Sequence, residues 1–240
     1  MTTRFHIGAK ELRGNIAAYA KRFDLLEVRA DSTRPTEALL RKWRKQVPPH
    51  FEFCVVAGPQ LALLKESPEL DAELDTTLKT IAALQARCLL LPTPVEVTPS
   101  PLSRQRMQKV LDRLPRDATH VIWEPRGVWE TEDAALAAKK WDIVLAVDAS
   151  RDPVPVGPVA YARLRALGET RSFGPAALGR IVDAIGTRRD AYVVLETTTA
   201  LAECKRLRQL AQKSKTFEGG MGRVVRPKNL VMKVRDDEQE

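Results

Sequence analysis

The sequence predicts an α/β fold, a TIM-type (β/α)8 barrel with the sixth helix missing or reduced and with a basic C-terminal tail. Eight short apolar or β-branched runs alternate with amphipathic stretches of helical period, which indicates right-handed βαβ units and a parallel sheet. The segment after the first run contains no glycine-rich phosphate loop, which disfavours an open doubly wound sheet. We expect one barrel over residues 1–214 and a polar, basic tail over residues 215–240.

The first half of the chain predicts four strand–helix units. The third helix is the clearest, because Ser67-Pro68-Glu69 is typical of a helix start and apolar residues, mostly leucines, then recur at intervals of three or four residues. The expected strands are Phe5–Ile7, Leu25–Val28, Phe51–Val56 and Cys88–Leu91. The expected helices lie at about Gly14–Arg22, Thr36–Gln46, Ser67–Leu84 and Ser103–Leu114.

The second half repeats the pattern with one interruption. Residues Arg151–Pro158 hold three prolines and one glycine, so this connection is too short and too rich in proline for a full helix. The expected strands are Val121–Glu124, Ile143–Val147, Val159–Leu164 and Tyr192–Leu195. The expected helices lie at about Thr131–Lys140, Pro175–Ile185 and Ala200–Gln212.

The net charge of +8 belongs largely to the end of the chain. Residues 205–240 contain ten Lys or Arg against five Asp or Glu, so the basic C-terminal segment is a candidate nucleic-acid contact or, alternatively, a solvated solubilising tail. Aromatic residues are only 5%, which argues against stacking platforms for single strands. No apolar run is long enough for a signal peptide or a bilayer span, so we expect a cytoplasmic protein without a membrane partner.

Function in a barrel of this type lies at the carboxyl ends of the strands. We predict Glu124 and Asp148 as catalytic groups, with Glu124 as acid, base or metal ligand. Arginines at this end suit an anion, because a guanidinium binds phosphate or carboxylate through two hydrogen bonds. The ligand-binding candidates are Lys10, Glu27, Arg29, Arg126, Trp129 and Arg163.

Two alternatives apply to the same residues. The carboxylates and arginines can instead pair with each other, as Glu124 and Arg126 or Glu27 and Arg163 would, in which case their role is structural. Oxygen ligation would suit magnesium or manganese, but we assign no metal ligands, and three histidines at wide spacing disfavour a zinc cluster. Trp129 can wall a ligand pocket or pack a loop onto the barrel.

Several short motifs, in order, resemble the domain-of-unknown-function 72 (DUF72, YecE-like) family. Glu124-Pro125-Arg126-Gly127-Val128-Trp129 is similar to its Glu-x-Arg-x-x-Trp pattern. The segments Tyr19–Val28, Trp43–Phe53 and Tyr161–Leu164 and the single residue Asp148 are similar to further motifs. Asparagines expected after the last strand are replaced by Glu196-Thr197-Thr198-Thr199, which marks a divergent member. The resemblance implies a TIM-type barrel and no settled activity.

Two functions follow as hypotheses. The first is a barrel whose mouth binds a phosphorylated or other small anionic ligand, with hydrolase chemistry on a phosphoester if the protein is an enzyme. The second is a non-catalytic binding or scaffold protein with a degraded site and a basic tail that contacts nucleic acid or a protein. The sequence does not indicate an oligomeric state.

Overall fold

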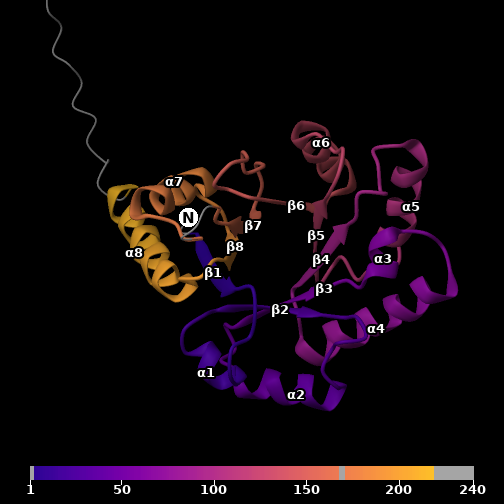
Figure 1. Cartoon of the computed structure of the whole chain (residues 1–240), viewed down its shortest axis with the longest axis horizontal. Helices are drawn as coiled ribbons and strands as arrows, with labels where there is room; N and C mark the ends of the chain where they lie inside the picture. The colour runs from indigo at the N-terminus through magenta and orange to yellow at the C-terminus, as the bar shows by residue number, and fades with distance from the viewer. Residues whose placement is uncertain (1–2, 168–170, 219–240) are drawn as a thin grey trace, which may run out of the picture.

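The chain forms the predicted barrel (Figure 1). The computed structural model describes residues 3–167 and 171–218, the last six of them without their side chains. All seven strand pairs in the sheet are parallel, in the order β1-β8-β7-β6-β5-β4-β3-β2, so β1 and β2 are the two ends that meet. The strands are β1 (Arg4–Ala9), β2 (Leu25–Arg29), β3 (Glu52–Val56), β4 (Cys88–Thr93), β5 (His120–Pro125), β6 (Val144–Val147), β7 (Val159–Arg165) and β8 (Asp190–Glu196).

Helices surround the sheet, and the expected gap after β6 is confirmed, because residues 148–158 contain no helix. A short helix after β3 was not expected; Pro59 starts it directly after Gly58. The helices are α1 (Ile16–Ala20), α2 (Glu37–Gln46), α3 (Pro59–Leu63), α4 (Pro68–Leu84), α5 (Pro101–Leu111), α6 (Thr131–Trp141), α7 (Pro175–Ile185) and α8 (Ala200–Glu218).

The last helix, α8, is longer than the hydrophobic period of the sequence predicts. It continues to Glu218, beyond the expected end at Gln212 and beyond residue 214, where we placed the end of the barrel. Residues 219–240, which hold most of the predicted basic tail, lie outside the described residues, so the expected nucleic-acid contact of this tail stays a prediction. Within the described residues, no helix is both long and apolar enough to cross a membrane.

The two faces of the sheet bury different sets of side chains. One large cluster packs strand residues against the helices, as the alternation of side chains along a strand requires. A second cluster contains strand residues only, Cys54, Cys88, Tyr161 and Tyr192 among them, and fills the barrel interior. The rings of His6, Tyr192 and Tyr161 stack in series there, 4.8 and 6.0 Å apart. Cys54 and Cys88 are free thiols, and both are buried.

At the amino ends of the strands, a cluster of charged side chains around Asp190 covers the barrel interior. Asp190 begins β8 and is only 4% exposed, and it accepts hydrogen bonds from Arg4 at 2.9 Å and Arg189 at 3.0 Å. His6 Nε2 lies 3.1 Å from the same carboxylate. Pairing of this buried acid satisfies it at the end of the barrel opposite the mouth.

A single tyrosine bridges the seam between β1 and β2. The seam has a backbone bond from Asp24 N to Ile7 O of 2.8 Å, but β1 and β2 share no ladder. The Tyr19 hydroxyl accepts from Ala9 N at 2.8 Å and lies 2.9 Å from Leu25 O, to which it donates. The two strands approach so closely that a Cβ on Gly8 would clash with the Leu25 carbonyl. The Tyr19 side chain therefore replaces the missing ladder.

Because no helix connects β6 to β7, a groove is left beside α6, the helix that follows β5. It has a volume of about 1280 Å³ and lies between α6 and the proline-rich connection from β6 to β7. Val156 and Leu136, on its two sides, are among the exposed large hydrophobic residues.

We expect Tyr19→Phe to lower the free energy of unfolding by about 1–3 kcal/mol, because it keeps the ring and removes a buried hydroxyl that pairs with two strands. Urea denaturation followed by circular dichroism measures this. The control is Thr77→Val, which removes a buried hydroxyl without a hydrogen-bond partner among the described residues and is expected to be neutral or stabilising. Equal effects of the two changes would contradict the role of Tyr19.

Candidate functional site

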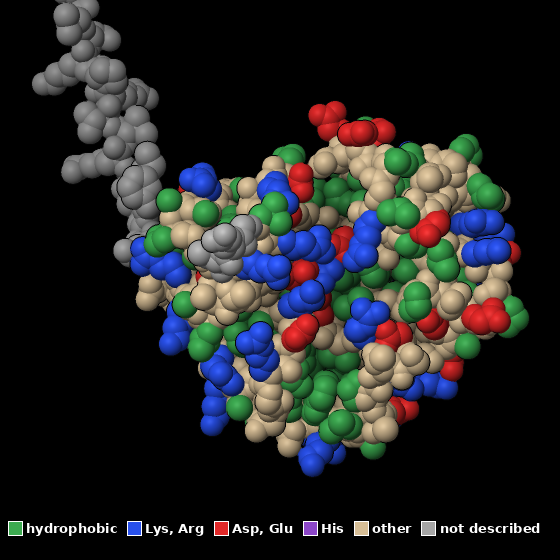
Figure 2. All heavy atoms as spheres, viewed as in Figure 1, with side chains coloured by type: hydrophobic (Ala, Val, Ile, Leu, Met, Phe, Trp, Pro, Cys, Tyr) green, Lys and Arg blue, Asp and Glu red, His purple; other side chains and the backbone are tan. Residues whose placement is uncertain are grey.

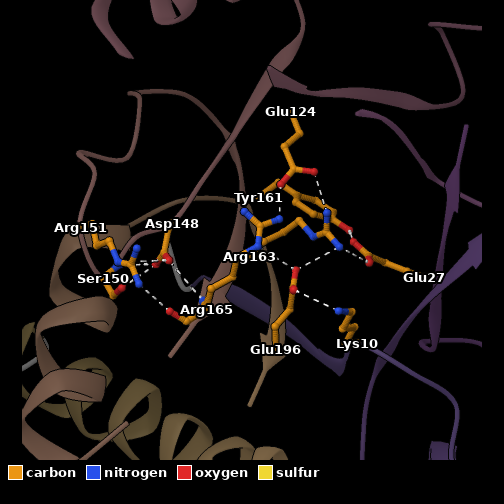
Figure 3. A network of polar contacts seen from close by, with 10 residues as sticks. All are labelled: Lys10, Glu27, Glu124, Asp148, Ser150, Arg151, Tyr161, Arg163, Arg165 and Glu196. Carbon is orange, nitrogen blue, oxygen red and sulfur yellow. Dashed lines mark hydrogen bonds and ion pairs between the residues drawn. The ribbon is translucent and has the colours of Figure 1, made fainter. Parts of the chain in front are cut away.

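The mouth of the barrel is built around one strand, β7. Tyr161, Arg163 and Arg165 alternate along it, so their side chains share the inner face. Three other strands add acidic side chains at the mouth: Glu27 from β2, Glu124 from β5 and Glu196 from β8 (Figure 3). Figure 2 shows Lys, Arg, Asp and Glu side chains gathered over the centre of the end it faces.

Arg163 lies at the centre of this group and is 12% exposed. Its guanidinium binds three carboxylates, at 2.6 Å from Glu124 Oε2, 3.1 Å from Glu27 Oε2 and 3.1 Å from Glu196 Oε1. Its Nε is buried without a hydrogen-bond partner among the described residues. The predicted pairing of Glu27 with Arg163 is present, whereas Glu124 pairs with Arg163 and Arg165 rather than with Arg126.

Arg165 and Lys10 form the outer layer of the network. Arg165 is 42% exposed and contacts Glu124 Oε1 at 2.5 Å and Glu196 Oε1 at 3.3 Å. Lys10 Nζ lies 3.6 Å from Glu196 Oε2. Because its guanidinium is partly in solvent, Arg165 retains N–H groups that face outward.

Burial and neighbouring charges shift the pKa values of Glu27 on β2 and Glu124 on β5 in opposite directions. Burial raises the pKa of Glu27, although Arg163 and a 2.7 Å hydrogen bond from the Tyr161 hydroxyl oppose this. Burial also acts on Glu124, but Arg163 and Arg165 together outweigh it and lower its pKa. Glu124 is therefore ionised at neutral pH and is not a general acid there.

Asp148 lies after β6 and is held by its own loop. Its Oδ1 accepts from the hydroxyl of Ser150 at 2.6 Å and from Ser150 N at 3.1 Å. Its Oδ2 accepts from Arg165 N at 3.2 Å and lies 3.8 Å from Arg151 Nε. These bonds hold the Asp148 carboxylate against the end of β7, and its expected catalytic role stays a prediction.

A cavity of about 170 Å³ opens beside the network between β5, β6 and β7. Its charged lining residues are Glu124, Arg126, Asp148, Asp152, Arg163 and Arg165. Arg126 directly follows β5, is exposed and has no carboxylate partner among the described residues. It is thus the cation of this lining that is free to bind a ligand.

Two predicted ligand-binding residues have other contacts. Arg29 ends β2 and pairs with Asp31 at 2.6 Å, outside the network around Arg163. Trp129 lines the cavity, but its Nε1 donates to Val97 O at 2.6 Å and its ring packs against Trp123 with centroids 4.8 Å apart. The loop-packing interpretation of Trp129 agrees with these contacts.

Arg165 and Glu196 belong to the mouth although they were not among the predicted site residues. Tyr161 is a further contributor that sequence reasoning missed. Its position two residues before Arg163 on the same strand is the signal that would have found it. Among the described residues, no three His, Cys, Asp or Glu side chains are grouped as metal ligands. The oxygens of Glu27, Glu124 and Glu196 are engaged by the guanidinium groups of Arg163 and Arg165, the Tyr161 hydroxyl and the Lys10 ammonium instead, and this does not fit a metal centre.

Comparison with known proteins agrees with the motifs. The profile of the family described as "Protein of unknown function DUF72" matches residues 5–227. No curated protein matches the sequence. Among solved structures, a DUF72 family protein from Enterococcus faecalis V583 is similar with a TM-score of 0.71 and 14% identity, over 87% of this chain and 96% of that one.

Two further structures share the fold. A DUF72 family protein from Thermotoga maritima MSB8 has a TM-score of 0.64 at 14% identity, over 89% of this chain and 99% of that one. An AP endonuclease, family 2, from Brucella melitensis has a TM-score of 0.58 at 12% identity, over 82% of this chain and 93% of that one. At these identities the likeness shows the TIM-type barrel and nothing of the chemistry.

We expect Glu124→Gln to lower the free energy of unfolding at pH 7 by about 1.5–3 kcal/mol, because two arginines lose a charged acceptor. The folded-state pKa of Glu124 lies below its ordinary value of 4.5, so its contribution is present above that pH and is lost as the pH falls through the folded-state value. The difference from the unsubstituted protein should therefore shrink below pH 4.5.

Urea unfolding at a series of pH values measures both effects. The matched control is Glu66→Gln, since Glu66 is 69% exposed and pairs with Lys109 at the surface, where such pairs contribute little. A deficit of Glu124→Gln that stayed constant down to pH 3 would contradict the assigned ionisation of Glu124.

Proposed function

The chain belongs to the DUF72 family of proteins of unknown function, and from this premise we propose that its barrel mouth binds a small anionic ligand in the cavity between β5 and β7. The observation that carries the proposal is Arg126, an exposed guanidinium without a carboxylate partner among the described residues, on the wall of a cavity that Arg165 also lines.

The two arginines suit an anion in different ways. Arg126 brings a full positive charge that nothing in the described contacts neutralises, so it supplies the attraction. Arg165 is tied to Glu124 and Glu196 on one side, which fixes the direction of its remaining N–H groups. A phosphate or carboxylate between them would accept hydrogen bonds from both. Arg163 does not take part, because three carboxylates already surround it.

The cavity size limits the ligand. About 170 Å³ accommodates a phosphate or carboxylate group with a few further atoms. Trp129, Leu145 and Val147 give one side of the cavity an apolar surface. The part of the ligand that carries the anionic group is therefore expected to be partly apolar.

Hydrolysis of a phosphoester, the reaction expected from the sequence, would use Glu124 as a general base toward water. Glu124 is ionised, which a base requires. Its two oxygens each accept a hydrogen bond from an arginine, however, and this lowers its affinity for a proton. We therefore favour ligand binding over hydrolysis at this site.

A second candidate is the non-catalytic scaffold, and the pairing of Arg163 favours it. Together with Arg165 and Lys10, Arg163 balances the charges of the three carboxylates, so the network is a self-contained structural unit that needs no ligand. In this alternative the mouth is a closed ion network, and Arg126 is an ordinary solvated side chain.

We expect isothermal titration calorimetry to show binding of inorganic phosphate that Arg126→Ala weakens about ten-fold or more, in line with about 1.5–3 kcal/mol for a charged hydrogen bond. The matched control is Arg180→Ala, which removes an exposed arginine on α7. Absence of phosphate binding, or equal weakening by both changes, would overturn the proposal and leave the scaffold alternative.

A further inference from the structure

The outer surface formed by α8, α1 and α2 carries six exposed cationic side chains that have no carboxylate partner among the described residues. We call this surface the basic rim. Two residues come from the end of α1, two from α2 and two from α8. They are Lys21, Arg22, Lys42, Lys45, Lys205 and Arg206.

The three helices are neighbours, so the rim is one surface. Arg208 of α8 donates to Arg22 O at 3.1 Å and to Asp24 Oδ2 at 2.5 Å, which joins α8 to the turn after α1. Figure 1 places α8, α1 and α2 in sequence along the left and lower edge of the molecule. Figure 2 shows Lys and Arg side chains along this edge, with no Asp or Glu visible at its lower left.

The acidic side chains of the same segments do not neutralise the rim. Glu203 is 3% exposed and accepts from Phe173 N, whereas Asp24 binds Arg208 and Glu37 binds Arg41. Among the described residues, none of the six rim side chains has a carboxylate partner.

The cations on and just after α4 and α5 differ from those of the rim. Several exposed ones are paired, Lys79 with Asp75, Lys109 with Glu66 and Arg113 with Asp71, at 2.7 to 2.8 Å. Exposed cations without a carboxylate partner among the described residues also occur elsewhere, as at Lys65, Arg126 and Lys139. The rim differs in that six of them lie on adjacent helices and their connecting turn.

We infer that the basic rim binds the phosphate backbone of a nucleic acid, without preference for its base sequence. Several unpaired ammonium and guanidinium groups spread over adjacent helices match a line of phosphates, and their binding releases condensed counterions. The rim carries no aromatic residue among the six, so it offers backbone contacts and no stacking platform.

The apolar content of the rim distinguishes nucleic acid from the other anionic partner, a membrane surface. Interfacial helices insert large apolar or aromatic side chains between lipids. Among the described residues, the exposed large hydrophobic residue on these three helices is Leu39, and the others lie elsewhere on the protein. A surface with cations and a single exposed leucine suits phosphates in solution.

The test is binding of the full chain to a fluorescent 20-base-pair DNA duplex, followed by anisotropy between 50 and 200 mM salt. The rim variant is Lys42→Gln, Lys45→Gln and Lys205→Gln together. If these three residues contact phosphates, the slope of log affinity against log salt becomes smaller in magnitude by about 2.7, because each contact contributes about 0.9. The control is Lys65→Gln, Lys139→Gln and Lys140→Gln together, which removes the same charge from exposed positions elsewhere.

Each outcome decides for or against the rim. A reduced slope in the rim variant, with an unchanged slope in the control and in Arg126→Ala, supports the proposal. No binding by the unsubstituted chain, or equal loss in both triple variants, overturns it. If truncation after Glu218 abolishes duplex binding while the rim variant binds with an unchanged salt slope, the binding belongs to residues 219–240. That result also overturns the proposal. Weaker binding of the rim variant to phosphatidylserine vesicles, but not to the duplex, would assign the rim to a membrane.

Discussion

The buried guanidinium of Arg163 constrains the mouth of the barrel. A charge that is 12% exposed is costly to remove from water, and the strands around it supply the compensation. Glu27, Glu124 and Glu196 come from β2, β5 and β8, so a single side chain on β7 connects strands on different sides of the barrel. The same arrangement keeps Glu124 ionised and takes Arg163 out of use as a ligand clamp. What remains for a ligand is at the border of the network, where Arg126 and Arg165 face the cavity.

The fold could be predicted from the sequence almost completely. Hydrophobic residues repeat every two residues in a strand and every 3.6 residues in a helix, and this pattern is a local property of each segment. α3 was missed because its start, Gly58-Pro59, also suits a turn that ends the preceding strand. The end of α8 was missed because polar residues follow Gln212. The members of the mouth could also be named, since strand ends converge in any such barrel. Their partners could be predicted only in part. The pair of Glu27 and Arg163 was expected, but the choice of Arg163 over Arg126 for Glu124 depends on strand order and side-chain reach.

The charges of the molecule fall into two groups with different physical roles. At the mouth, cations and carboxylates are interleaved and largely cancel, so the field there is local and directional. On the helices of the basic rim, the cations have no such partners among the described residues, and their field extends into solvent over a Debye length of about 10 Å at 0.1 M salt. A single net charge of +8 combines these two situations and describes neither of them.

The seam at Tyr19 determines where the barrel opens most readily. A protein opens locally where few bonds must break, and β1 and β2 are joined by one backbone bond and one hydroxyl, whereas β1 and β8 pair at six successive positions. The strands that line the cavity, β5 to β7, lie inside the strand order, with at least two strands between each of them and the seam. Opening at the seam would therefore expose the Ala9 amide to hydrogen exchange while the strands around the cavity stay paired.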